Sequence, residues 1–304
     1  MDTITVYILC RNRVDYLAEA IDSIINQSII SHRVNVVVSD NSTTNDVYHM
    51  VTDRYKDKVS YVKKSGLLRS YEHIQDIIRE AKGEYTVIFH DDDIARPDFI
   101  NIAIERLEKN QQLGAVAPNS ISFGSGRNFF TMSRVSLFSK LINNDRSLYT
   151  DNYLIQGSVP AFCGYVYRTS ILKKVKVENL TGIYFDSVLI GEIIKNSLGV
   201  LWLPNILILS RVHGNNEGLI DNLKERYKLV EFLQNSYGVE IPDFYYDYYI
   251  GIAKLRLNTK NNRMAGLIAL FLIKFSFLIS YKVVKIYFGR IVSRLFFIIF
   301  PSNV

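Results

Sequence analysis

Residues 83–93 constrain the fold more than any other stretch, because a short apolar run leads directly into three consecutive carboxylates. Between Tyr85 and Phe89 the one polar residue besides tyrosine is Thr86, which is typical of a strand buried on both faces. Asp is a poor strand residue, and neighbouring like charges repel. The run from Asp91 to Asp93 therefore predicts that a cation compensates these charges where the strand ends.

The position of the carboxylates predicts a ligand site. In open α/β sheets, ligands bind at the carboxyl ends of the strands. Oxygen ligands suit Mg²⁺ or Mn²⁺, which commonly take one or two carboxylates together with phosphate oxygens of a substrate. A solvated acidic turn that caps a helix beginning near Pro97 is the alternative interpretation.

Apolar strands and amphipathic helices alternate along the first 110 residues. The pattern predicts strands at 3–9, 34–38, 59–62 and 85–89, and helices at 14–26, 70–81 and 97–110. Further on, it predicts a helix that begins near Asp186 and strands at 200–203 and 206–209. This alternation predicts an α/β fold with a doubly wound, mostly parallel sheet.

Charge divides the chain near residue 220. Residues 1–220 hold 24 Lys/Arg and 24 Asp/Glu, whereas residues 221–304 hold 12 and 6, and no acidic residue follows Asp247. We therefore expect a domain at 1–220 and a basic, helical, membrane-associating tail at 221–304. The neutral domain argues against a nucleic-acid partner, and the tail indicates an anionic membrane surface.

Two apolar segments of the tail, 264–281 and 283–300, carry basic side chains that include Lys285, Arg290 and Arg294. They predict basic amphipathic helices that lie on a membrane, while a span by 264–281, core helices or a dimer interface are the alternatives. The N-terminus lacks a signal-peptide pattern, and the two cysteines form no disulfide or zinc pattern. The expected location is the cytoplasmic face of the cell membrane, peripheral or monotopic.

Five stretches in order along the chain resemble the family 2 glycosyltransferases of the GT-A fold, which are nucleotide-sugar-dependent enzymes common in bacterial surface-polysaccharide pathways. The stretches are residues 6–13, 38–43, 81–93, 183–186 and 210–216. Two departures stand out. His90 occupies the place where many members have the first Asp of an Asp-x-Asp motif, and Phe185-Asp186 stands where a Glu-Asp pair is common.

The resemblance implies a site for a UDP- or dTDP-sugar at the ends of the first strands. Cys10, Arg11 and Arg13 follow the first strand and would contact the nucleotide, with the arginines reaching the diphosphate. Asp40 would accept a hydrogen bond from the uracil or thymine imide or from the ribose, and Asp91 would join them. An Asx turn or helix N-cap at Asp40 and ordinary surface arginines are the alternatives.

The resemblance also implies a metal site and a catalytic base. Asp92, Asp93 and His213 would hold Mn²⁺ or Mg²⁺, although a lone histidine can also be structural. Asp186 would act as general base on the acceptor hydroxyl, with Glu192 as the fallback. The alternative for Asp186 is a first-turn carboxylate that faces the helix dipole.

The expected activity is inverting transfer of a sugar to a hydroxyl of a saccharide or lipid-linked acceptor in capsule or O-antigen synthesis. The alternative is a non-catalytic, membrane-associated protein with the same fold that binds a nucleotide or glycan. A nucleotidyltransferase is disfavoured because no Gly-rich, basic phosphate loop follows the first strand. A dinucleotide dehydrogenase is excluded because no Gly-x-Gly-x-x-Gly motif is present there.

Overall fold

The computed structural model describes most of the first 213 residues and one further helix. The described residues are 3–28, 33–124, 146–148, 162–177, 182–197, 199–213 and 223–237. The predictions for segments 264–281 and 283–300 lie outside these residues.

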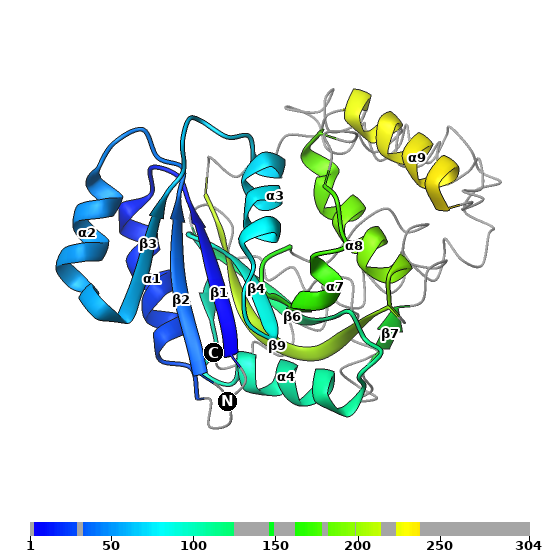
Figure 1. Ribbon diagram of the computed structural model, residues 1–304, viewed down its shortest axis with the longest axis horizontal. Helices are drawn as coiled ribbons and strands as arrows, with labels where there is room; N and C mark the ends of the chain where they lie inside the picture. Colours follow the sequence, from blue (N-terminus) through cyan, green and yellow to red (C-terminus); the bar gives the residue numbers. More distant parts are fainter. Residues whose placement is uncertain are drawn as a thin grey trace, which may run out of the picture.

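Strands and helices alternate through the N-terminal part of the chain, as predicted (Figure 1). The elements before residue 115 are β1 (Thr3–Cys10), α1 (Val14–Ile25), β2 (Arg33–Asp40), α2 (Asp46–Arg54), the 3₁₀ helix η1 (Lys56–Lys58), β3 (Val59–Lys63), α3 (Ser70–Glu80), β4 (Tyr85–His90), β5 (Ile94–Ala95) and α4 (Phe99–Lys109). The later elements are β6 (Ala115–Gly124), β7 (Arg146–Leu148), β8 (Tyr165–Arg168), α7 (Thr169–Leu172), the 3₁₀ helix η2 (Gly182–Tyr184), α8 (Phe185–Lys195), β9 (Val200–Val212) and α9 (Leu223–Tyr237).

Four parallel strands form the N-terminal half of the sheet, in the order β3-β2-β1-β4. The register pairs Cys10 with Asp40 and Leu9 with His90, so the loops after β1, β2 and β4 leave the sheet at the same edge. Tyr85 to Phe89 are fully buried, as the apolar run predicts for a strand covered on both faces. The predicted parallel α/β sheet is confirmed here.

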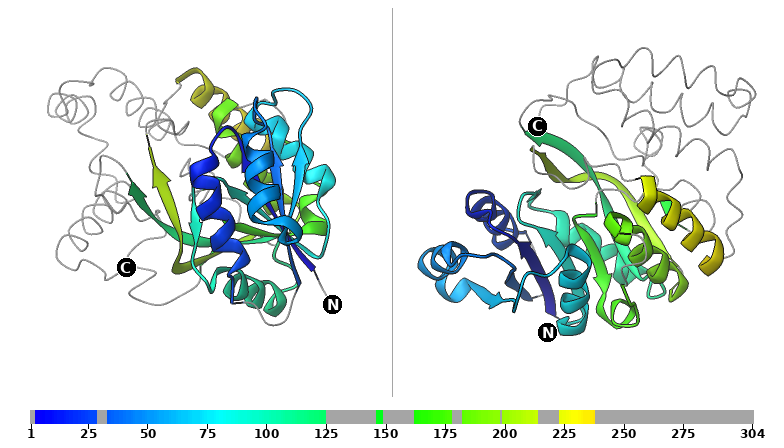
Figure 2. Two further views of the ribbon diagram at one scale, coloured as in Figure 1. Left: turned by 90° about the vertical axis from the view of Figure 1, so that its left-hand side faces the viewer. Right: turned by 90° about the horizontal axis from the view of Figure 1, so that it is seen from above.

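Helices cover both faces of this sheet (Figures 1 and 2). One core cluster joins Leu17 and Ile21 of α1 and Phe99 of α4 to one face, together with α2. The second cluster joins Ile77 of α3 and Ile190 of α8 to the other face. For α1, α3, α4 and α8, the apolar stripes that predicted the helices are the surfaces that the two cores bury.

Beyond β4 the sheet becomes mixed. β8 pairs antiparallel with β4 and β6, and β5 and β7 pair antiparallel with β9, while the long β6–β9 ladder is parallel. The strands predicted at 200–203 and 206–209 are both present, but they form one strand, because β9 is continuous through Pro204. The ladder is irregular there, opposite Pro118 of β6, since proline has no backbone N–H to donate.

Local sequence signals predicted some helix boundaries less accurately. The helix predicted from Pro97 begins at Phe99, after Asp98 at the N-cap position. Helix α2 escaped the sequence analysis because Val47 and Val51 are its only buried residues, too few for a clear apolar period. Gly83 does follow the end of α3, with a left-handed φ of 87°.

The start of the predicted tail packs on the domain. Helix α9 lies at the start of the segment expected to be helical, and its Leu229 is 2% exposed within the same core cluster as α3 and α8. Among the described residues, no helix has the length and apolar character needed to cross a membrane. Residues 238–304 lie outside the description.

Candidate active site

The candidate site lies at the carboxyl edge of β1, β2 and β4, where the end of β9 joins them. Strand β5 follows the acidic residues and pairs antiparallel with β9, matching Ile94 with Leu209. This pairing carries Arg211 and His213 alongside the acidic loop, although they are more than one hundred residues away in sequence. The topology therefore explains why the predicted site residues meet.

Asp91 connects the end of β4 to the loop after β1. Its Oδ2 accepts a hydrogen bond from the Arg11 backbone N–H at 3.1 Å, and its Oδ1 accepts one from Arg13 Nη1 at 3.0 Å. The Cys10 thiol is a further hydrogen-bond partner of this carboxyl. The structure thus brings together four residues that the sequence assigned to nucleotide binding.

Asp92 contacts Arg13 and His213, both of which the sequence analysis assigned to the site. Its Oδ2 accepts a second hydrogen bond from Arg13 Nη1 at 3.0 Å and lies 2.8 Å from His213 Nε2. The His213 ring is buried and stacks on Tyr16 with 5.5 Å between the ring centroids. Asp92 and His213 are therefore neighbours, as expected for ligands of one ion.

Asp93 turns to a different side of the loop. Its Oδ1 accepts a hydrogen bond from the Arg211 backbone N–H at 2.8 Å, and its Oδ2 lies 3.8 Å from His90 Nδ1. The thiol of Cys163 is another hydrogen-bond partner of this carboxyl. In this arrangement the predicted metal set divides, with Asp92 beside His213 and Asp93 beside His90 and Cys163.

Burial disfavours the charged form of two carboxyl groups in the acidic loop. Asp91 and Asp93 are each 3% exposed, and burial raises the pKa of both against the opposing effects of Arg13 and His90. The adjacent Asp92 raises both pKa values further. Carboxylate oxygens with an imidazole nitrogen are a donor set that fits Mn²⁺ or Mg²⁺, and such an ion would offset the charge.

Arg211 braces the acidic loop, a role that the sequence did not reveal. Its Nε donates to the Asp92 backbone carbonyl at 3.0 Å, and its Nη2 bonds to Glu19 at 2.9 Å. The guanidinium lies between the rings of Tyr16 and Phe123, 4.5 Å from each centroid. The Arg211 side chain is thus engaged with other protein groups.

Asp40 has no exposed oxygen. Its Oδ1 accepts the Ser42 backbone N–H at 2.8 Å, which forms the Asx turn that the sequence left as an alternative. Its Oδ2 accepts hydrogen bonds from the Tyr61 hydroxyl at 2.6 Å and Lys63 Nζ at 2.9 Å. Burial raises the pKa of Asp40, but the hydrogen bonds from Lys63, Ser42 and Tyr61 outweigh it and lower the pKa.

The loops after β1 and β2 are joined by Asn12, which the sequence analysis missed. Its backbone N–H donates to Ser42 Oγ at 2.7 Å, and its Oδ1 accepts the Thr43 N–H at 3.0 Å. Asn12 has a left-handed φ of 56°, a conformation that Asn tolerates better than most residues. An Asn in the turn after a strand was the available sequence signal.

Asp186 lies in the first turn of α8, where its Oδ1 accepts the Ser187 backbone N–H at 2.7 Å. Burial raises the pKa of Asp186 to about 6, and nearby His90 opposes the increase. The rings of His90, Phe162 and Phe185 form a chain, with centroid separations of 5.9 and 5.6 Å, that leads from the acidic loop toward α8. His90, which precedes the acidic residues, is therefore close enough to Asp186 to influence its pKa.

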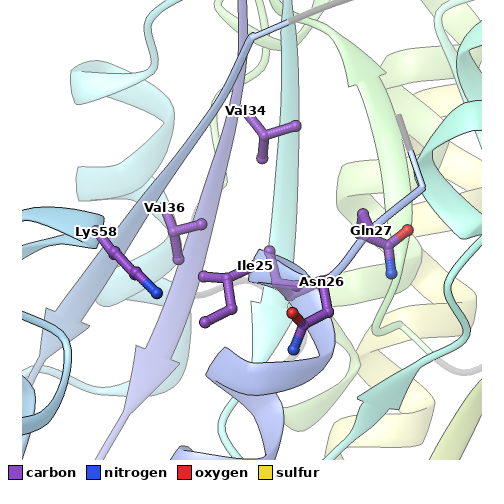
Figure 3. Close-up of a pocket in the computed structure, with 7 residues that line it drawn as sticks. Ile25, Asn26, Gln27, Val34, Val36 and Lys58 are labelled. Atoms are coloured by element: carbon purple, nitrogen blue, oxygen red, sulfur yellow. The ribbon is translucent and has the colours of Figure 1, made fainter. Parts of the chain in front are cut away.

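A separate cavity of about 320 Å³ lies at the opposite edge of the sheet, between the end of α1 and the start of β2 (Figure 3). Its lining residues are Ile24, Ile25, Asn26, Gln27, Val34, Val36 and Lys58. None of the candidate site residues contributes to it, so the chemistry of the acidic loop does not extend there.

Comparison with known proteins finds similar sequences. A family model described as "Glycosyl transferase family 2" matches residues 5–176. Abequosyltransferase RfbV of Salmonella typhimurium (strain LT2) is 24% identical over 253 residues, which cover 77% of this chain and 73% of that protein.

Solved structures share the fold at low sequence identity. The crystal structure of S. aureus TarS 1-349 in complex with UDP-GlcNAc aligns with a TM-score of 0.63 and 14% identity, over 90% of this chain and 77% of TarS 1-349. The mannosyltransferase PcManGT from Pyrobaculum calidifontis, in complex with GDP-Man and Mn²⁺, aligns with a TM-score of 0.57 and 15% identity, over 96% and 86% of the two chains. The resemblance to GT-A proteins is thus confirmed for the fold.

Proposed function

This chain belongs to glycosyl transferase family 2, and we propose that it moves a sugar from a UDP- or dTDP-sugar to a hydroxyl of a saccharide or lipid-linked acceptor, with inversion. The product would enter a surface polysaccharide such as capsule or O-antigen. The main supporting observation is the convergence of Asp91, Asp92 and Asp93 with Arg13 and His213 at one sheet edge. The name of RfbV, an abequosyltransferase, supports a sugar-transfer role.

The donor would bind across the loops after β1 and β4. Asp92 and Asp93, with His213, would hold Mn²⁺ or Mg²⁺, and such an ion supplies positive charge for the diphosphate leaving group when bound. Arg13 is 31% exposed and bonds to both Asp91 and Asp92, so its guanidinium can also reach a phosphate oxygen. Cys10 and Arg11 would complete the same wall, since both contact Asp91.

Asp40 would act on the donor through its neighbours. Its carboxylate is fully buried, so it holds Lys63 and Tyr61 in place through hydrogen bonds of 2.9 and 2.6 Å. The Lys63 side chain is 37% exposed, and its Nζ also bonds to the Thr44 carbonyl. Asp40 is therefore proposed as a residue that positions the nucleotide-binding loop.

Asp186 would take the proton from the acceptor hydroxyl as the sugar is transferred. A general base is most effective when its pKa lies near the working pH, and burial has raised the pKa of Asp186 to about 6. The aromatic chain from His90 to Phe185 would form part of the wall between donor and acceptor and limit the access of water.

Nucleotide binding tests the proposal. UDP and dTDP are titrated by calorimetry, with and without Mn²⁺, into the wild-type protein, Asp92→Asn and the control Asp57→Asn. Asp57 is exposed in η1, at the opposite edge of the sheet. We expect Mn²⁺ to strengthen binding to the wild type and to Asp57→Asn, but not to Asp92→Asn, because that change removes a ligand charge. Equal strengthening in all three proteins contradicts the assignment of Asp92.

A further inference from the structure

Cys163, His90 and Asp93 form a compact group beside the proposed donor site. Their candidate ligand atoms, one from each residue, lie within 4.8 Å of one another. Cys163 lies in the turn before β8, whereas His90 and Asp93 lie at the end of β4 and in the loop after it. The antiparallel pairing of β4 with β8 places these two segments side by side.

The three side chains are already directed toward one another. His90 Nδ1 lies 3.8 Å from Asp93 Oδ2, and the Asp93 carboxyl is a hydrogen-bond partner of the Cys163 thiol. The His90 backbone N–H is a further partner of the sulfur. Since Asp93 Oδ1 is held by the Arg211 N–H at 2.8 Å, the Oδ2 atom stays on the side of His90 and Cys163.

The donor chemistry differs from that of Asp92 and His213. Thiolate, imidazole and carboxylate together are ligands typical of Zn²⁺, whereas Mn²⁺ and Mg²⁺ favour oxygen ligands. Bonds of about 2.0 to 2.3 Å require zinc ligands to lie within about 4 Å of one another, so a small contraction of the group suffices. Three protein ligands also leave a fourth, tetrahedral position for water.

We propose that His90, Asp93 and Cys163 form a Zn²⁺ site that shares only Asp93 with the site for the donor's ion. The Zn–S bond forms as the Cys163 thiol loses its proton to solvent, so each ion bound releases one proton from sulfur. The His90 side chain is 37% exposed, whereas Asp93 and Cys163 are buried, so His90 is the ligand that solvent reaches. No residue spacing in the sequence indicates this site, because its cysteine comes from a distant segment.

A regulatory consequence rests on the proposed function. Asp93 belongs to both the zinc group and the set proposed for Mn²⁺ or Mg²⁺, so the two ions compete for one carboxylate. Zn²⁺ would therefore inhibit sugar transfer, and Cys163→Ser would reduce the inhibition.

Cobalt absorption tests the site without requiring turnover. Co²⁺ takes the place of Zn²⁺ and gives a near-ultraviolet charge-transfer band only when a thiolate is bound to it. The full chain is titrated with Co²⁺ as wild type, Cys163→Ser and Cys10→Ser. Cys10 is the matched control, since it is also buried and contacts Asp91, outside the group. We expect the band in the wild type and in Cys10→Ser, its absence in Cys163→Ser, and its loss on addition of Zn²⁺.

A second variant guards against misfolding of Cys163→Ser. His90→Ala changes a partly exposed side chain and should weaken Zn²⁺ binding at least about tenfold while the cobalt band remains. No band in the wild type, a band in folded Cys163→Ser, or unchanged zinc affinity in His90→Ala overturns the proposal. Because these readouts do not depend on a sugar donor, they separate failure of the zinc site from failure of the proposed transferase activity.

Discussion

At the scale of single residues, Asp186 shows how one position can satisfy two interpretations at once. It occupies the first turn of α8 and accepts the Ser187 N–H, which is what a helix-dipole carboxylate would do. However, burial raises the pKa of Asp186 to about 6, whereas a purely stabilising first-turn carboxylate has a lowered pKa. The two roles therefore predict opposite effects of the same substitution.

Asp186→Asn should reduce turnover by at least about a hundredfold with little change in donor affinity, because general-base catalysis contributes about that much. In the wild type, turnover should rise as pH increases through about 6 and then level off, since only the deprotonated carboxyl accepts a proton. Turnover and donor binding as functions of pH check this. Near-normal turnover of Asp186→Asn, together with an inactive Glu192→Gln, would move the base to Glu192.

The same variant should be more stable than the wild type at pH 7. A folded-state pKa above the ordinary Asp value means that the charged carboxyl disfavours the fold, a penalty absent below pH 3.8 and complete above about 6. Removing the charge should raise the free energy of unfolding by about 1 to 3 kcal/mol at pH 7, with no gain at pH 3.5. Urea unfolding measures both, and a loss of stability at pH 7 supports the helix-dipole role instead.

The sequence predicted which residues gather at the site more successfully than it predicted the contacts of each residue. The acidic run after an apolar strand was enough to place Asp91, Asp92 and Asp93, because the end of a buried parallel strand has a fixed location. Two contacts could not be predicted from this pattern. The enclosure of Asp40 depends on Tyr61 and Lys63 of the neighbouring strand, and the contact of Asp93 with Cys163 depends on a strand pairing that no local pattern encodes.

At the scale of elements, the turn between α3 and β4 positions the start of β4, the strand that leads into the acidic loop. Gly83 has a φ of 87°, and a Cβ built on it would lie 2.6 Å from the Thr3 carbonyl oxygen. The Glu84 N–H donates to that same oxygen at 2.9 Å, so the start of β4 is fixed against the start of β1. A side chain at position 83 would disturb this alignment.

A pair of glycine substitutions tests the turn. Gly66 also has a left-handed φ, 79°, but a Cβ there would meet nothing within 4 Å. Gly66→Ala should cost about 1 kcal/mol for the backbone conformation alone, and Gly83→Ala about 1 to 3 kcal/mol more because of the clash. Urea unfolding of both variants gives the comparison. Equal losses would show that the close approach to Thr3 has no energetic effect.

Elements with strong periodic patterns were predicted, and those defined by tertiary context were not. β1, β2 and β4 are apolar runs that need both faces covered, so their sequences determine them. The continuity of β9 through Pro204 depends on its pairing with β6, and α2 is specified by two buried valines. In the sequence, the proline argues against a continuous β9, and the sparse apolar spacing argues against α2. Packing against the rest of the fold outweighs both local signals.

At the scale of the whole molecule, the basic tail leads us to propose peripheral membrane association at the cytoplasmic face. Nine Lys/Arg and no acidic residue follow Asp247. Each basic residue near an anionic surface contributes about 1 kcal/mol, which is ample even after screening. The full chain should therefore sediment with vesicles that contain phosphatidylserine, remain in solution with vesicles of phosphatidylcholine alone, and be released by high salt.

A charge variant makes this test specific. Arg290→Gln with Arg294→Gln removes two of the tail's charges and should weaken sedimentation with anionic vesicles. Arg54→Gln with Arg79→Gln, on exposed faces of α2 and α3, removes the same charge from the domain and should not. If the full chain does not sediment with anionic vesicles, that result contradicts the membrane proposal and favours a dimer interface.

Turnover of nucleotide sugars is the decisive test of the proposed transferase activity. The full chain is incubated with UDP-, dTDP- and GDP-sugars, with Mn²⁺ or with a chelator, and release of the nucleoside diphosphate is measured. We expect ion-dependent release from a UDP- or dTDP-sugar by the wild type and by Asp57→Asn, with severe loss in Asp92→Asn. A folded protein that binds a nucleotide yet releases none from any donor, even with saccharide acceptors present, would contradict transfer and indicate a binding protein built on the same fold.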